Sequence, residues 1–259
     1  MMNVQIVDYS TLIAFWLVFT RLMAIIFQLP LFDNQAVPGI VKVLATLVIT
    51  FAFYPYVESH VLFDVKQIGV SNFWWLTICN VAIGLILGLF VKSIMNIFIS
   101  AGSIITQEVG FSAINYFDPN AEQQVGPFEK LIQWSIVILL LSSGALIPMF
   151  KGILISFSTM HVHDLGRLLQ SHLFFFSFFK GIFISSLLLA SPLIFMNLLI
   201  SSILGIIARM VPQMNVIMVS FVVNIGLGLM VFASISDEFF QVAFKIYTDK
   251  LADWIQFIG

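Results

Sequence analysis

Long uncharged runs, separated by single charged residues, make up most of this chain. Four runs reach 20 residues or more, which is about the length that a helix needs to cross a bilayer. They are residues 67–91, 131–150, 181–208 and 210–236, with borderline runs at 43–57 and 93–107. No run alternates apolar and polar residues as a barrel strand does. Because backbone groups in lipid must be satisfied within their own segment, the pattern predicts an all-α, membrane-type fold.

The basic residues give no clear membrane topology. An ordinary multi-span protein concentrates Lys and Arg in alternate loops. Here one basic residue falls at nearly every junction between runs, which leaves two interpretations open. Either the few charges carry no signal, or the segments do not all end as simple spans. These residues are Lys42, Lys66, Lys92, Lys130, Lys151, Lys180 and Arg209.

Polar residues inside the apolar runs need partners. Arg21 at a bilayer centre would cost at least about 2.5 kcal/mol, so we expect it to be buried against protein, although the sequence identifies no acid for it. Gly84 and Gly88 have the spacing of close helix packing. Four asparagines predict interhelical hydrogen bonds worth about 0.6 to 2 kcal/mol each. They are Asn80, Asn96, Asn197 and Asn224.

The last 23 residues, 237–259, carry a different pattern. Apolar side chains recur there at helical spacing and polar ones fill most of the other side, which predicts an amphipathic helix. The polar face holds more acids than bases, which argues against attraction to anionic lipid and favours packing on protein. The apolar side consists of Phe240, Phe244, Tyr247, Leu251, Trp254 and Ile258.

Composition narrows the function classes. Of 259 residues, 60% are hydrophobic and 9% are charged, against about 25% charged in a soluble domain. The chain therefore needs membrane lipid, partner subunits or both. A net charge of −2 provides no basic field for nucleic acid. The single cysteine, Cys79, excludes an intrachain disulfide, and the first residues lack the basic region of a cleaved signal peptide.

The sequence offers little for catalysis or metal binding. The one candidate cluster is HVHD, residues 161–164. His161 and His163 would not share a helical face, and His161 with Asp164 gives only two ligands. No nucleophile elbow, phosphate-binding loop or zinc motif occurs. We expect no catalytic residue, no metal and no cofactor.

The middle of the chain contains a segment of unusual character, EVGFSAINYFDP at residues 108–119. It is too polar for a lipid-facing helix and too apolar for a solvated linker. An ordinary connecting loop is one interpretation, since loops of this length are common. Buried or channel-lining backbone is the other, because non-helical backbone at membrane depth is tolerated only in such places.

Three blocks of the sequence resemble the FliR family of flagellar export-gate proteins. The first reads RLMAIIFQLPLFDNQAVPGIVKVLATLVITFAFYP (residues 21–55), and the second reads AGSIITQEVGFSAINYFDPN (101–120). The third reads SPLIFMNLLISSILGIIARMVPQMNV (191–216). They follow the family order at the family length. Residues 143–158 favour the flagellar branch over the related virulence system, and Asn224 stands where many relatives would have a lysine.

The resemblance implies a structural subunit of a protein-export channel. Its partners would be the gate subunits FliP and FliQ, an FlhB-type export switch protein and exported flagellar proteins, in the inner membrane within the flagellar basal body. Residues 1–180 would be a FliP-like helical part with a plug loop at 106–130, and 181–259 a FliQ-like hairpin with the amphipathic C-terminal helix. A stand-alone small-solute transporter is the alternative, but it would require an internal inverted repeat, which we do not find.

The resemblance also assigns residues. The expected channel plug comprises Gly110, Phe111, Ser112, Ala113, Ile114, Asn115, Tyr116, Phe117, Asp118 and Pro119. Residues expected to shape the chain or contact other subunits are Arg21, Pro30, Pro38, Lys42, Arg209, Pro212, Gln213 and Asn215.

Overall fold

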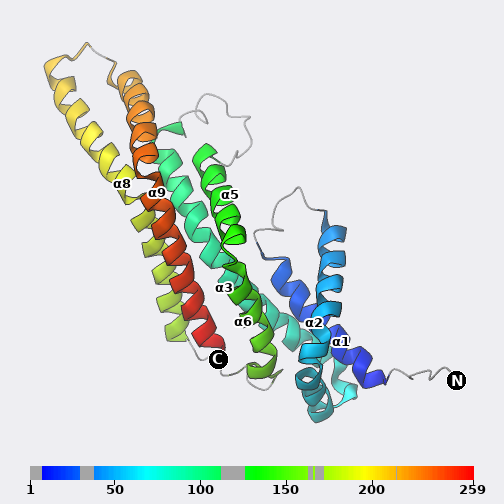
Figure 1. Cartoon of the computed structure of the whole chain (residues 1–259). Helices are drawn as coiled ribbons and strands as arrows, with labels where there is room; N and C mark the ends of the chain where they lie inside the picture. Colours follow the sequence, from blue (N-terminus) through cyan, green and yellow to red (C-terminus); the bar gives the residue numbers. More distant parts are fainter. Residues whose placement is uncertain (1–7, 30–37, 112–125, 163–165, 167–171, 214) are drawn as a thin grey trace. The chain divides into compact units, whose positions relative to one another are not determined.

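The computed structural model describes residues 8–29, 38–111, 126–162, 166, 172–213 and 215–259. In this part of the chain all regular structure is helical, with seven α-helices, one short 3-10 helix and no strand (Figure 1). The all-α prediction is confirmed. The helices are α1 (Tyr9–Ile26), α2 (Gly39–Ile68), η1 (Val70–Asn72), α3 (Phe73–Glu108), α5 (Pro127–Ser142), α6 (Leu146–Thr159), α8 (His172–Met210) and α9 (Val216–Ile258).

Single lysines do not interrupt the helices. α3 continues through Lys92 and α8 continues through Lys180, so these two residues lie inside helices and not between spans. Lysine has high helix propensity, which is why one charge leaves the backbone helical. The real break lies at Gly69, whose φ of 89° ends α2 before η1. The predicted domain boundary near Lys180 stays a prediction.

The run at residues 131–150 is not one straight helix, contrary to what its length suggests. α5 ends at Ser142, α6 begins at Leu146, and the two helices are bent by 77° at this break. Gly144 lies in the break with φ of 69°, a conformation that glycine adopts without a Cβ penalty. A hydrophobicity pattern does not register such a turn, because Gly144 and its neighbours are uncharged.

Five helices are long and apolar enough to cross a membrane, or up to six spans if the bent pair α5–α6 counts as one. Their burial differs greatly. In α3 61% of the most apolar window is buried inside the chain, whereas in α9 the share is 11%. The exposed apolar side chains of α9 therefore face lipid or another protein.

The chain forms two compact units. Unit 1 comprises Met1–Ser93, Ala145–Ser177 and Lys250–Gly259. Inside it, glycines bring α3 onto α1. A Cβ on Gly84 would lie 2.6 Å from the carbonyl oxygen of Arg21, and one on Gly88 would lie 3.2 Å from Cα of Ile25. The close packing predicted for these two glycines is confirmed.

The C-terminal segment closes the core of unit 1. Phe257 stacks on Phe174, with ring centroids 4.4 Å apart. Trp254 is fully buried against Gly152 of α6, where a Cβ would lie 2.7 Å from Cζ3 of the indole. Of the predicted apolar stripe, four members are buried, namely Tyr247, Leu251, Trp254 and Ile258. Phe239 and Ala243 complete the buried face, while Phe240 and Phe244 are half-exposed.

Unit 2 comprises Ile94–Gly144 and Phe178–Asp249. Its α3 and α5 cross closely, since a Cβ on Gly102 would lie 2.7 Å from Cα of Glu129. Phe128 of α5 then packs edge-on against Phe232 of α9, with centroids 5.0 Å apart. α3 and α9 therefore both contact the first turn of α5.

Candidate functional site

The predicted plug begins where α3 ends in unit 2. The N–H of Val109 donates to the carbonyl of Ile105 at 2.9 Å, and the N–H of Gly110 donates to the carbonyl of Gln107 at 3.0 Å. Gly110 has φ of 93°, the left-handed conformation in which helices commonly terminate. The backbone therefore leaves the helix axis at the first residue of the expected plug.

Two helices fix this end of α3. Asn197 of α8 donates its side-chain amide to the carboxylate of Glu108. Gly228 of α9 lets Val109 approach so closely that a Cβ there would lie 2.7 Å from Cγ2 of the valine. Glycine at position 228 is thus required by the contact and not by the backbone conformation. The start of the plug segment is anchored to a polar group on one helix and a small residue on another.

An aromatic contact and a buried amide lie next to Gly110. The ring of Phe111 packs on that of Phe128, with centroids 5.8 Å apart. A Cβ added to Gly110 would lie 3.8 Å from Cδ2 of Phe221 and 4.0 Å from Cβ of Asn224, both on α9. The side-chain oxygen Oδ1 of Asn224 is buried and has no hydrogen-bond partner in the described part of the chain. The site therefore combines apolar packing with one unused acceptor.

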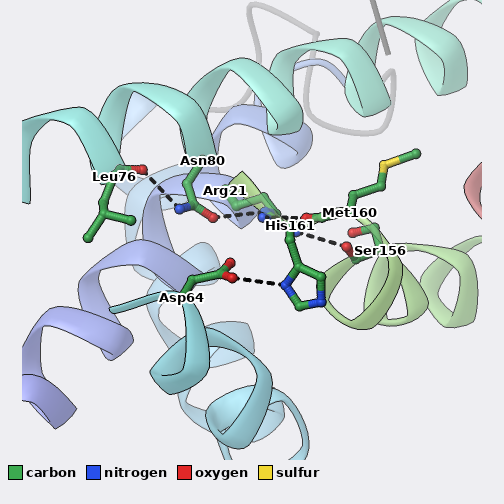
Figure 2. Close-up of polar contacts among 7 residues, drawn as sticks. All are labelled: Arg21, Asp64, Leu76, Asn80, Ser156, Met160 and His161. Carbon is green, nitrogen blue, oxygen red and sulfur yellow. Dashed lines mark hydrogen bonds and ion pairs between the residues drawn. The ribbon is translucent and has the colours of Figure 1, made fainter. Parts of the chain in front are cut away.

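A second polar site lies in unit 1 around Arg21, whose side chain is 1% exposed. Figure 2 shows the guanidinium donating Nε to Oδ1 of Asn80 at 3.0 Å and Nη1 to the carbonyl of Ser156 at 3.0 Å. Nη2 donates to the carbonyl of Met160 at 3.3 Å, and the ring of Phe157 lies 4.4 Å below Cζ. Arg21 of α1 thus binds the C-terminal end of α6, where the carbonyl of Ser156 also accepts the N–H of Met160 at 3.0 Å.

A buried acid completes this site. Asp64 of α2 is 4% exposed, and its Oδ1 lies 2.9 Å from Nδ1 of His161 (Figure 2). Its carboxylate also lies within electrostatic reach of Arg21. The sequence analysis did not identify Asp64 as a site residue. The available signal was that Asp64 shares one face of its helix with the apolar residues Val61 and Val65, which indicates a buried acid. The four helices α1, α2, α3 and α6 meet at this one cluster.

Comparison with known proteins decides the family. The family model described as bacterial export proteins, family 1, matches residues 12–249 of this chain. The chain belongs to this family. It is 28% identical over 244 residues to the "Flagellar biosynthetic protein FliR" of Pectobacterium carotovorum subsp. carotovorum, covering 92% of this chain and 91% of that protein. Proteins of the same name from Escherichia coli (strain K12) and Bacillus subtilis (strain 168) are each 24% identical and cover about 90% of both chains.

The turn between α8 and α9 of this bacterial export protein is exposed. Pro212 and Gln213 lie in it, and Asn215 caps α9, since its Oδ1 accepts a hydrogen bond from the N–H of Met218 at 3.3 Å. Arg209 is exposed as well, and no hydrogen bond or ion pair joins it to another described residue. The contact of Arg209 with another subunit stays a prediction.

The remaining predicted residues of the export protein are dispersed. Pro38 directly precedes α2, and its carbonyl accepts from the N–H of Val41 at 3.0 Å. The Nζ of Lys42 lies 5.7 Å from the ring of Phe27. Pro30 and the plug residues Ser112 to Pro119 lie outside the described residues. His163 and Asp164 also lie outside them, and among the described residues no group of three potential metal ligands occurs.

An exposed Arg209 leads to a first prediction. In the chain alone, Arg209→Ala should leave folding unchanged, because the side chain contributes no contact there. In the assembled export complex, loss of a surface ion pair worth up to about 1 kcal/mol should lower recovery about fivefold. Co-purification of tagged chain with its partners measures this. Arg209→Lys is the matched control that keeps the charge, and equal recovery of both variants would rule out the pairing.

Proposed function

We propose that this chain is a non-enzymatic structural subunit of the flagellar type III protein-export gate, which forms and closes a channel for unfolded flagellar proteins. The observation that carries the proposal is similarity along about nine-tenths of both chains to proteins named FliR. Those names also favour the flagellar system over a virulence system. The five apolar helices support a place in a membrane, which we assign to the inner membrane within the basal body.

The partners that we propose are FliP, FliQ and an FlhB-type protein, with exported flagellar proteins as the cargo. The low burial of α9 supports this proposal, because its apolar surface is larger than one chain can cover. Exposed apolar side chains on the membrane-length helices include Ile203, Ile206, Met218, Val222 and Met230. Partner subunits and membrane lipid would share this surface.

We further propose that residues 106–130 close the channel. Support comes from the turn at Gly110, from the anchoring of α3 by Asn197 and Gly228, and from the aromatic residues that follow in the sequence. Hydrophobic constrictions close pores by excluding water. A seal of this kind rests on modest apolar contacts, so an unfolded protein can displace it.

Deletion of Ser112 to Phe117 should therefore open a leak without preventing assembly. A connecting segment contributes little core area, so the helices should still pack. A channel without these apolar side chains should fill with water, and cells expressing the variant should take up a small charged probe. Phe117→Ala should give a smaller leak in the same direction. An assembled deletion variant with no added conductance would make the segment an ordinary loop.

The function itself is tested by removing the gene from the bacterium that encodes it. We expect no flagellar filament protein in the culture medium and full restoration by the intact gene on a plasmid. Normal secretion of filament protein by the deletion strain would contradict the proposal. The amount of filament protein inside the cells serves as the control, because it separates a defect in export from a defect in synthesis.

A further inference from the structure

A hollow opens between α8 and α9 inside unit 2. It is half-open and has a volume of about 210 Å³. Its one charged lining residue is Glu238 of α9, and the remaining lining residues are apolar. Those residues are Leu188, Leu189 and Pro192 of α8 with Ile235, Phe239 and Val242 of α9.

A proline of α8 lines this hollow. Pro192 lies inside the helix and has no N–H, so the carbonyl of Leu188 loses its helical donor. The hydroxyl of Ser191 donates to that carbonyl at 2.7 Å and replaces the missing bond. The turn of α8 beside the hollow is therefore stabilised locally.

Glu238 has no counter-charge in the hairpin. No hydrogen bond or ion pair joins it to another described residue, and the facing run of α8, residues 181–208, carries no charge at all. The next basic residue along α9, Lys245, is two turns away, which is about 10 Å along the helix axis. An ionisable side chain beside a membrane-length apolar run is costly unless it is paired. Glu238 is exposed in the single chain, where water solvates its carboxylate, so a subunit that covers the hollow would have to bring the counter-charge.

The hollow has the size of one large side chain. An apolar cavity of about 150 Å³ holds a benzene molecule, whereas sites for small-molecule ligands span about 300–1,000 Å³. A hollow of about 210 Å³ therefore fits a single aromatic or branched aliphatic side chain. A lipid acyl chain would leave the carboxylate uncompensated, and an anionic headgroup would be repelled by it.

We propose that this hollow is a docking site for a helix of another subunit, which inserts one bulky apolar side chain between Pro192 and Phe239 and places a Lys or Arg one turn away against Glu238. Residues three or four apart share a helical face, so one partner helix can supply both groups. The basic group supplies the charge that the hairpin lacks, and the apolar group fills the space beside Pro192. This inference rests on the proposed function in one respect, namely that the inserting helix belongs to another subunit of the export gate.

Photo-crosslinking in the assembled complex tests the geometry. The full-length chain carries p-benzoylphenylalanine in place of Val242, which lines the hollow and is 42% exposed. We expect a crosslinked partner peptide with a bulky apolar residue and a Lys or Arg three or four positions away. The same probe at Val222, exposed on α9 outside the hollow, is the control and should capture a different peptide. Adducts with lipid alone, or a peptide without such a base, would overturn the proposal.

Charge exchange tests the chemistry. Glu238→Lys should lower the yield of that crosslinked peptide at least about tenfold, as loss of a buried charge pair does. Replacing the partner's base by Glu should restore the yield.

Asp237→Lys makes the same change on the adjacent residue, which does not line the hollow, and should keep the yield. Glu238→Gln keeps the shape of the side chain and removes its charge. A lower crosslinking yield at an unchanged amount of the variant in the membrane, measured by immunoblot, separates lost charge from misfolding. Equal yields for the intact chain, Glu238→Gln and Glu238→Lys would reject the pairing.

The two proposals fail differently. If deletion of the gene leaves flagellar export intact, the proposed function is wrong whatever occupies the hollow. If deletion abolishes export but the Glu238 variants assemble and crosslink like the intact chain, the function stands and the docking site is wrong.

Discussion

Arg21→Met should lower the free energy of unfolding of unit 1 by about 3–5 kcal/mol, the range measured when one partner of a buried charged network is removed. Methionine fills similar space but donates no hydrogen bond. Oδ1 of Asn80 and the carbonyl of Met160 would lose the donor that Arg21 provides, the carbonyl of Ser156 would keep only the N–H of Met160, and Asp64 would lose the nearby positive charge. A buried acceptor without a partner costs about 1–3 kcal/mol.

Arg21→Lys should restore only part of this loss. A lysine ammonium is a compact charge on a flexible chain, whereas the planar guanidinium donates in three directions here. Thermal unfolding of the purified chain in detergent measures the effect, and resistance of α6 to protease reports it locally. Arg209→Met is the matched control, because it removes an exposed arginine. Equal melting temperatures for the two Met variants would show that the cluster does not stabilise the fold.

Gly102→Leu should destabilise unit 2 by about 3 kcal/mol, at the upper end for an overpacked contact. A Cβ at this position meets Cα of Glu129 at 2.7 Å and the carbonyl oxygen of Phe128 at 3.3 Å. These are backbone atoms that no rotamer change can move away. α3 and α5 would have to separate, and the contact of Phe128 with Phe232 would be disturbed with them.

A glycine in open space provides the control for Gly102. Gly226 lies inside α9, and a Cβ added there would have no neighbouring atom within 4 Å, so Gly226→Ala should stabilise the helix by up to about 1 kcal/mol. Chemical or thermal unfolding of both variants in the same detergent gives the comparison. A Gly102→Leu protein as stable as Gly226→Ala would mean that α3 and α5 do not cross as closely as described.

The sequence predicts burial and periodicity better than it predicts partners. The cost of an arginine in an apolar helix indicated that Arg21 would be buried, and the helix period placed Tyr247 and Trp254 on a buried face. The acceptors of Arg21 were not predictable, because Ser156 and Met160 contribute main-chain carbonyls 135 and 139 residues away. Any residue type offers such a carbonyl, so the sequence carries no trace of the contact.

Three of the helices end close to a glycine with positive φ and not at a lysine. The lysines at 92 and 180 marked no helix end, while Gly69, Gly110 and Gly144 did, each with positive φ. Gly110 was expected as part of the plug segment. The break at Gly144 was not expected, since it lies within an uncharged run whose length alone resembled one membrane span.

A native mass spectrum of the complex that this chain forms in its own bacterium tests the central claim most directly. We expect the chain to be released from the membrane in one assembly with FliP and FliQ, and to be aggregated or degraded when they are absent, because the apolar surface of α9 requires protein. A discrete, stable monomer or dimer of this chain alone, in detergent and without those subunits, would contradict the claim and favour a stand-alone transporter.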